Sequence, residues 1–191
     1  QAVLDVRRQN SSWRREAGNL YSRVQAVELG DGGVIELALD QVVQEPEQAR
    51  AAGVEYVEVE SRLLSEFRGE RVVLRAGVLR PDAHLPSRKY AAVFEIPGFG
   101  GDHEGVVGRA RARAMRPRDP VERGLSERAF WIVLDPEGPN GHHLFADSEA
   151  NGPVGRALVE ELIPELTRRY NLIDAPEARL LRGHSSGGWR V

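Results

Sequence analysis

The segment Gly183-His184-Ser185-Ser186-Gly187-Gly188 has the spacing Gly-x-Ser-x-Gly, which is typical of a serine nucleophile on a sharp turn between a strand and a helix. At such a turn the serine has an unfavourable backbone conformation, and a side chain two positions away on either side would strike the neighbouring strand or helix. Ser186 would need a glycine where His184 stands, so only one reading frame fits. The pattern predicts Ser185 as a nucleophile. A glycine-rich turn without a catalytic role is the alternative.

A serine that attacks an acyl carbon also needs backbone amides that hold the oxyanion of the tetrahedral intermediate. One such amide follows the nucleophile, here Ser186, and the other comes from the loop after an earlier central strand. The loop Pro97-Gly98-Phe99-Gly100-Gly101 follows an apolar run at that place, and its glycines let the backbone approach a ligand. We expect the second donor to be the amide of Phe99, with Gly100 as the alternative, and we expect Gly98 and Gly100 to border the substrate. A plain loop is the competing interpretation.

The five histidines of the sequence all precede Ser185, and six residues follow it. In folds with this turn the serine is followed along the chain by an acid and then by the histidine that acts as general base. We therefore expect the general base and the acid to be missing from this chain, which would make it part of a hydrolase. We expect His184, His103 and His142 to contact the substrate or shape its pocket, because loops at the carboxyl ends of strands line the pockets of open α/β sheets.

No metal or cofactor is expected. The groups at 102–104 and 142–147 contain imidazoles and carboxylates, which are metal ligands, but adjacent histidines on a loop seldom converge without a third ordered ligand. Solvated loop side chains are the preferred interpretation. The chain has no cysteine, which excludes disulfides and a cysteine nucleophile.

The overall charge gives no case for nucleic acid or an anionic membrane as partner, since the net charge is −3 and the pI is about 6.0. The arginines within 109–118 are interpreted as a solvated helix face. The apolar runs are far shorter than the roughly 20 residues that cross a bilayer, so no membrane segment is expected. A small molecule is the partner that fits this composition.

The elements that must position these residues are predicted from apolar periodicity and from turn residues. Strands are predicted at 55–59, 71–79, 90–96, 130–134 and 178–181. The first two should be paired antiparallel edge strands, and the continuous apolar runs at 90–96 and 130–134 should be buried on both faces of a sheet. Helices are predicted at 105–115 and 153–170, the second kinked or divided at Pro164. Alternating strands and helices predict an α/β fold with a mostly parallel sheet.

A change in the residue pattern, from polar segments to apolar strand candidates, divides the chain into residues 1–53 and residues 54–191. The first part is expected to be an N-terminal arm, a β-hairpin within 22–40 that turns at Asp31-Gly32-Gly33, and a short helix or linker at 44–53. The second part is expected to be a hydrolase portion that ends just after the serine turn. The first residue is Gln1 rather than Met, which slightly favours a secreted or periplasmic protein whose signal peptide was removed over a cytoplasmic one.

At these motifs the chain resembles the esterase family that includes esterase D and enterochelin esterase, within the α/β-hydrolase superfamily. The resemblance covers about residues 54–191, with 97–101 as the oxyanion loop, 147–153 before the helix and 183–189 as the serine turn. The chain has Pro97-Gly98 where these proteins more usually have His-Gly.

This resemblance implies the N-terminal part of an α/β-hydrolase fold and a serine esterase that forms an acyl-enzyme on a small-molecule ester. Two alternatives stay open. One is a binding or scaffold domain with an incomplete triad, and the other is a peptidase or acyltransferase with the same turn.

Overall fold

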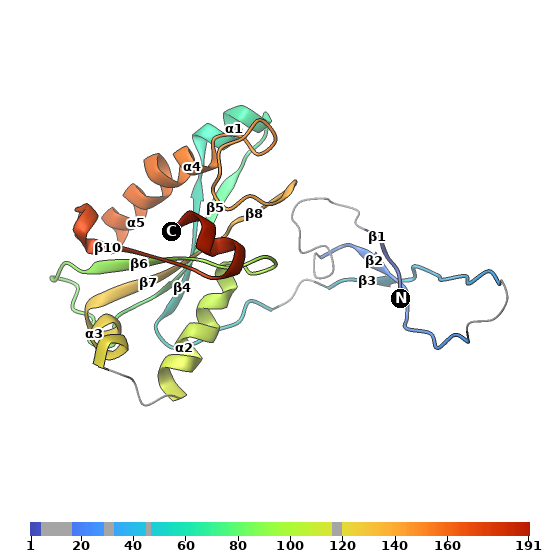
Figure 1. The fold of residues 1–191 in the computed structure, drawn as a ribbon, viewed down its shortest axis with the longest axis horizontal. Coiled ribbons are helices and arrows are strands. Elements are labelled where there is room, and N and C mark those ends of the chain that lie inside the picture. Colours follow the sequence, from blue (N-terminus) through green and yellow to red (C-terminus); the bar gives the residue numbers. More distant parts are fainter. Residues whose placement is uncertain (5–16, 29–32, 45–46, 116–119) are drawn as a thin grey trace.

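A five-stranded mixed sheet forms the centre of the fold (Figure 1). The computed structural model of the protein describes residues 1–4, 17–28, 33–44, 47–115 and 120–191. In the order in which they lie side by side, the strands are β10 (Arg179–Gly183), β6 (Ala91–Ile96), β7 (Ala129–Leu134), β5 (Val73–Leu79) and β4 (Val54–Glu60). β10, β6 and β7 are parallel, β5 pairs antiparallel with β7, and β4 pairs antiparallel with β5. The predicted α/β fold with parallel central strands and antiparallel strands beside them is confirmed.

The prediction that 55–59 and 71–79 are both edge strands is correct for the first and wrong for the second. β4 and β5 pair antiparallel over their whole length, from Val54 opposite Leu79 to Glu60 opposite Val73. β5 also pairs with β7, so it lies inside the sheet. The physical reason is that the last four residues of β5 are all buried, and a strand that is apolar on both faces needs neighbours on both sides.

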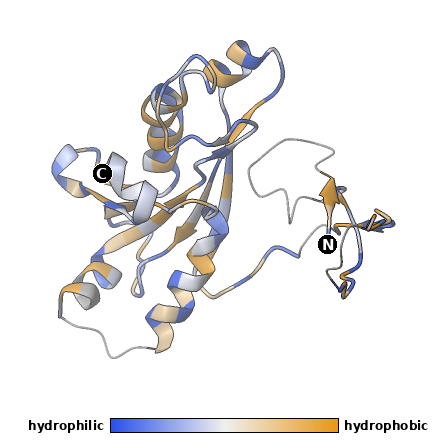
Figure 2. Cartoon of the chain, turned by 45° about the vertical axis from the view of Figure 1, so that its right-hand side comes forward, coloured by the Kyte–Doolittle hydropathy of each residue, from blue (hydrophilic) through white to orange (hydrophobic). Residues whose placement is uncertain are grey.

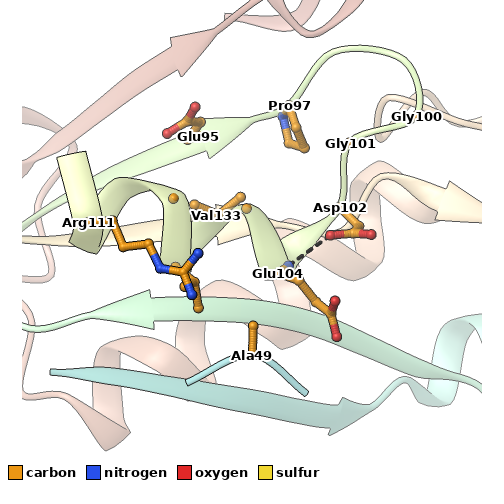
Figure 3. A pocket seen from close by; sticks show the side chains of 12 residues that line it. Ala49, Glu95, Pro97, Gly100, Gly101, Asp102, Glu104, Arg111 and Val133 are labelled. Atoms are coloured by element: carbon orange, nitrogen blue, oxygen red, sulfur yellow. Dashed lines mark hydrogen bonds between the residues drawn. The ribbon is translucent and has the colours of Figure 1, made fainter. Parts of the chain in front are cut away.

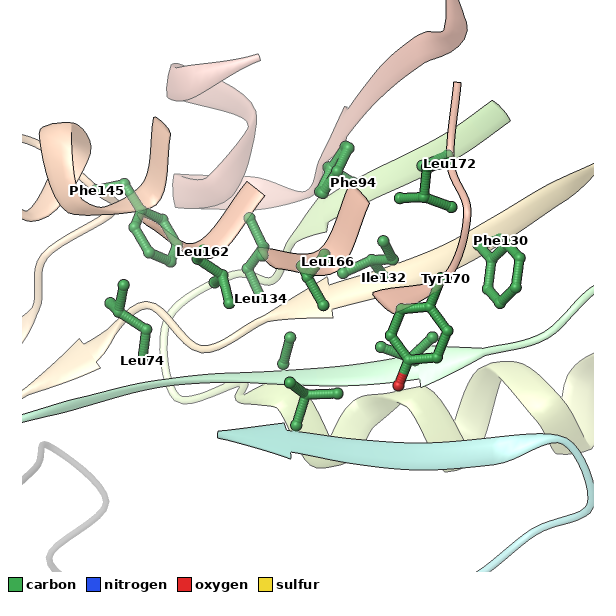
Figure 4. Close-up of a cluster of buried hydrophobic side chains, with 14 of the residues drawn as sticks. Leu74, Phe94, Phe130, Ile132, Leu134, Phe145, Leu162, Leu166, Tyr170 and Leu172 are labelled. Atoms are coloured by element: carbon green, nitrogen blue, oxygen red, sulfur yellow. The ribbon is translucent and has the colours of Figure 1, made fainter. Parts of the chain in front are cut away.

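Helices cover both faces of the sheet (Figure 1). One face carries α1 (Arg62–Arg68), α4 (Val154–Ala157), the π-helical segment η2 (Leu158–Leu162) and α5 (Ile163–Arg169). The other face carries the 3₁₀ turn η1 (His103–Gly105), α2 (Val106–Met115) and α3 (Pro120–Arg128). Leu162 and Leu166 pack with Phe94 and Ile132 of the sheet in the larger hydrophobic core (Figure 4). Figure 2 shows the hydrophobic residues concentrated along the central strands, between the two helical layers.

The helix predicted at 153–170 is divided ahead of Pro164, as expected, but by a π-helical segment rather than a kink. Ala157 and Leu162 are both fully buried although they are five residues apart, more than the roughly 3.6 residues of an α-helical turn. The amide of Ile163 bonds the carbonyl of Leu158, five residues back. The wider turn therefore keeps both buried residues on the face toward the sheet.

The N-terminal part contains a small three-stranded antiparallel sheet of β1 (Val3–Leu4), β2 (Leu20–Tyr21) and β3 (Gln41–Val42). The hairpin predicted within 22–40 is wrong in position, because residues 22–28 and 33–40 form no strand and the pairing lies outside them. Its predicted turn includes 31–32, which lie outside the described residues. Val34 and Ile35 are 91% and 52% exposed, and a lone hairpin with no surface to pack against is marginally stable.

The described residues of 44–53 form no helix, which fits the linker alternative. The remaining short elements are β8 (Glu137–Gly138), β9 (Gly141–His142) and the 3₁₀ turns η3 (Pro176–Ala178) and η4 (Ser185–Arg190). Among the described helices, every one is too short or too polar to pass through a lipid bilayer.

Candidate active site

Ser185 lies on a sharp turn directly after β10. The strand ends at Gly183, and the 3₁₀ helix η4 begins at Ser185 itself. The backbone of Ser185 has a φ of 52°, in the left-handed region that residues other than glycine seldom adopt. The residue is also exposed. A strained, exposed serine between a strand and a helix is the local geometry that presents a nucleophile to a substrate.

The two glycines that flank this serine leave no room for side chains. A Cβ built at Gly183 would lie 2.3 Å from the carbonyl oxygen of Gly187. A Cβ built at Gly187 would lie 2.2 Å from the carbonyl oxygen of Ile96 and 2.7 Å from that of Pro97. The first atom belongs to η4, and the other two belong to the end of β6 and the loop after it, so none can move aside without displacing backbone. The clash expected from the sequence pattern is therefore present on both sides of the serine.

The glycine loop after β6 forms a tight turn. The amide of Gly101 donates to the carbonyl of Gly98 over 2.9 Å, and Gly100 has a φ of 75°. A positive φ at the third position is the mark of a type II turn, which glycine accommodates without strain. The turn bond uses the amide of Gly101 rather than that of Phe99 or Gly100, so both stay candidate donors.

The structure brings this loop and the serine turn together. β10 and β6 are adjacent and parallel, so their carboxyl ends meet at one edge of the sheet. A Cβ built at Gly98 would lie 3.0 Å from the carbonyl oxygen of His184 and 3.1 Å from the Cβ of Ser185. The segments that contain the amides of Phe99 and Ser186 thus meet at Ser185.

His184 and His103 occupy different places. His184 is exposed, its carbonyl accepts the amide of Gly187 over 2.9 Å, and its ring lies beside the Pro97-Gly98 loop. His103 lies in η1, where its Nδ1 is 3.0 Å from Oδ2 of Asp135. His103 Nδ1 has no hydrogen-bond partner among the described residues, so this close contact is not counted as a hydrogen bond. Both side chains are largely buried, which places His103 between η1 and the end of β7.

His142 pairs with a buried carboxylate. Its Nδ1 lies 2.6 Å from Oε1 of Glu137 across the β8–β9 hairpin. On its other side, the ring of His142 makes an edge contact with the ring of Phe99, with centroids 5.9 Å apart. His142 therefore touches the glycine loop that abuts Ser185.

His143 and Asp147 have structural partners. Nδ1 of His143 accepts the amide of Phe145 over 3.0 Å, and burial lowers the pKa of His143 to about 4. The carboxylate of Asp147 accepts the amide of Gly155 over 2.5 Å at the start of α4. Among the described residues, no three acidic or histidine side chains are grouped so that they would hold a metal ion.

Asp135 and Glu137 were not among the residues that the sequence pointed to. Asp135 stands directly after β7 and accepts the amide of Glu137 over 3.2 Å, which starts the hairpin. Two features of the sequence could have indicated these acids. They follow an apolar strand closely, and Pro139-Asn140-Gly141 is a turn sequence that brings residue 137 opposite residue 142.

A cavity of about 420 Å³ lies beside the glycine loop, between that loop, α2 and Ala49 (Figure 3). Its polar lining comprises Glu95, Asp102, Glu104 and Arg111. The carboxylate of Asp102 accepts the amide of Glu104 over 2.9 Å, which caps η1. Ser185 does not belong to the lining, so this cavity is not the place where a substrate would meet the serine.

The strand order and the strand, serine and helix turn define an α/β-hydrolase fold. Two solved structures share it. A ferulic acid esterase has a TM-score of 0.55 and 14% sequence identity, over 72% of this chain and 52% of that chain. An S-formylglutathione hydrolase from Agrobacterium tumefaciens has a TM-score of 0.53 and 16% identity, over 75% of this chain and 53% of that chain.

The chain thus spans about half the length of these solved structures. No family model and no curated protein matches the sequence.

Proposed function

We propose that the protein is a serine hydrolase that cleaves carboxylic esters through an acyl-enzyme at Ser185. The observation that carries this proposal is the exposed, strained serine at the end of β10, packed against the glycine loop after β6. The names of the two enzymes that share the fold, an esterase and a hydrolase, support the same class of reaction.

The proposed reaction begins when a general base takes the proton of the Ser185 hydroxyl. The oxygen then attacks the ester carbonyl, and the amides of Ser186 and Phe99 stabilise the negative charge that forms on the carbonyl oxygen. The bond to the alcohol breaks, and the alcohol leaves with the proton held by the base. Water releases the acid from Ser185 by the same steps.

The general base and its acid are proposed to lie outside residues 1–191. Four of the histidines have other partners: His84 packs against aromatic rings, and His103, His142 and His143 contact a carboxylate or a backbone amide. His184 adjoins the serine, but it belongs to the extended backbone just before the turn. The unmatched half of the solved structures leaves room for both residues.

A fluorophosphonate probe tests the nucleophile. The protein in its full natural length should be labelled, and peptide mapping should place the label on Ser185. Ser185→Ala should abolish labelling and lower hydrolysis of 4-nitrophenyl acetate by at least about a thousandfold. Ser186→Ala is the matched control, because it keeps the backbone amide, and it should still be labelled. A label on another residue, or equal labelling of Ser185→Ala, contradicts the proposal and favours a binding domain.

A further inference from the structure

The β8–β9 hairpin holds a buried pair of polar side chains, Glu137 and His142. The two residues stand opposite each other across the hairpin, with 2.6 Å between Oε1 and Nδ1. Their side chains are only 5% and 4% exposed. A carboxylate only accepts hydrogen bonds, so the hydrogen of a neutral His142 ring is on Nδ1 and Nε2 is left as an acceptor.

Nε2 of His142 has no hydrogen-bond partner within the part of the chain that the structure describes, although it is buried. Native proteins leave few buried polar atoms unmatched, and those that stay unmatched call for a specific explanation. A hydrogen-bonding group from outside the described residues would complete the missing bond.

The ring of Phe99 contacts this ring, with 5.9 Å between centroids. Phe99 is 77% exposed, and exposed side chains change rotamer within nanoseconds. Its loop contacts the serine turn through Gly98. Phe99 therefore connects the ring of His142 to the loop beside Ser185, and a change in its rotamer changes the packing against that ring.

The charges around this ring select against an acidic ligand. Glu137 lies against His142, and its carboxylate disfavours a second carboxylate or a phosphate beside the ring. An acceptor nitrogen beside a carboxylate fits a neutral group that donates a hydrogen bond, and a hydroxyl is the simplest such group.

We propose that Nε2 of His142, oriented by Glu137, binds a hydroxyl group of the substrate, so that the enzyme prefers hydroxylated esters. This rests on the proposed ester hydrolysis at Ser185 and adds a substrate class to it. Sites that hydrogen-bond a substrate hydroxyl reject analogues without it, because the polar group of the protein is then left unmatched.

Two pairs of esters test the preference: ethyl 3-hydroxybutyrate with ethyl butyrate, and glycerol 1-monobutyrate with propyl butyrate. The full-length protein should show a kcat/KM at least about tenfold higher for the hydroxylated member of one pair. In His142→Leu this ratio should fall to about one. Equal rates within both pairs, or an unchanged ratio in His142→Leu, overturn the inference.

A binding measurement decides the matter even if a variant fails to fold or turnover is absent. Full-length Ser185→Ala protein with ¹⁵N-labelled histidine should show a shift of the Nε2 resonance of His142 with a hydroxylated ester and no shift with its partner ester. No shift with any of the four esters overturns the inference. Fluorophosphonate labelling of Ser185 reports separately on the proposed function, so the two failures are distinguishable.

Discussion

A Cβ on Gly187 would lie 2.2 Å from the carbonyl oxygen of Ile96, the last residue of β6. The helix after the serine therefore rests directly on the strand that leads into the glycine loop. Because the contact is between backbone atoms, the serine turn and the candidate oxyanion loop hold each other in place. This close approach, together with the contact of Gly98 with His184 and Ser185, sets the position of the serine relative to the loop.

Gly187→Ala should separate the two segments. The added methyl must push η4 away from β6, so we expect fluorophosphonate labelling of Ser185 to slow by at least about tenfold and the melting temperature to fall. Gly188→Ala is the matched control, since the nearest atoms to its Cβ are 3.9 Å away, and it should be labelled at close to the native rate. Equal labelling rates for the two variants would show that the contact does not position Ser185.

Among the carboxylates of the sheet, removal of Glu95 should lower the free energy of unfolding most. It accepts two hydrogen bonds from Arg109, at 2.8 and 2.6 Å, and one from the indole of Trp131 at 2.6 Å. Its side chain is 10% exposed, so Glu95→Leu leaves these donors partly buried without an acceptor. We expect urea denaturation to show a loss of about 2–3 kcal/mol.

Glu58→Leu provides the comparison for Glu95. Glu58 pairs with Arg75, and both side chains are about half exposed, so water screens the pair. Glu58→Leu should therefore lower the free energy of unfolding by at most about 1 kcal/mol. A loss for Glu95→Leu no larger than this would mean that the Arg109 and Trp131 donors find water instead.

Acid should destabilise the protein through His143. Burial lowers its pKa in the folded state to about 4, below the value of about 6.5 expected for an unfolded chain. As the pH falls below 6.5, the unfolded state takes up the proton first, so the stability contributed by neutral His143 is complete above pH 6.5 and is lost toward pH 4. The full effect is on the order of 3 kcal/mol.

His143→Asn tests this origin of acid sensitivity. The amide oxygen of asparagine retains an acceptor for the amide of Phe145, but it does not titrate. Urea midpoints measured between pH 4 and pH 7 should fall less steeply with acid for the variant than for the native protein. Parallel curves would assign the acid sensitivity to other groups.

Leu166 is expected to be a main stabilising contact between α5 and the sheet. It is fully buried in the larger hydrophobic core, so Leu166→Ala should lower the free energy of unfolding by about 2–5 kcal/mol. Val159 lies on the same helical stretch but is 62% exposed, and Val159→Ala should change stability by at most about 0.5 kcal/mol. Thermal or urea unfolding of the two variants gives the comparison.

The sequence was most informative where an element is apolar on both faces or carries an obligatory glycine. The runs at 90–96 and 130–134 became β6 and β7, and the glycines around Ser185 marked a turn that the structure shows. Local backbone chemistry decides such features, so they are visible in a short window of residues. The nearness of the 97–101 loop to the serine followed from placing both after parallel strands.

Features that depend on distant packing were missed or misplaced. α1 was not predicted, although Ser61 caps its start and Gly69 ends it with a φ of 72°, because seven residues between two strands give little periodicity. The predicted hairpin at 22–40 has alternating apolar residues but no surface to bury them against. Nothing in the composition showed that Glu137 would face His142, since this pairing depends on the register of a two-residue hairpin.

The π-helical segment η2 has a consequence for how the length of this helix may vary. The step from Ala157 to Leu162 is five residues, whereas an ordinary α-helix would bring a residue back to the same face after about four. The π-helical turn therefore contains one residue more than an α-helical turn. Deletion of Val159 would leave Leu162, Leu166 and Tyr170 facing the sheet, with the wide turn tightened into a regular one. The chain length between β7 and β10 is therefore adjustable by one residue at this point without a shift of the core.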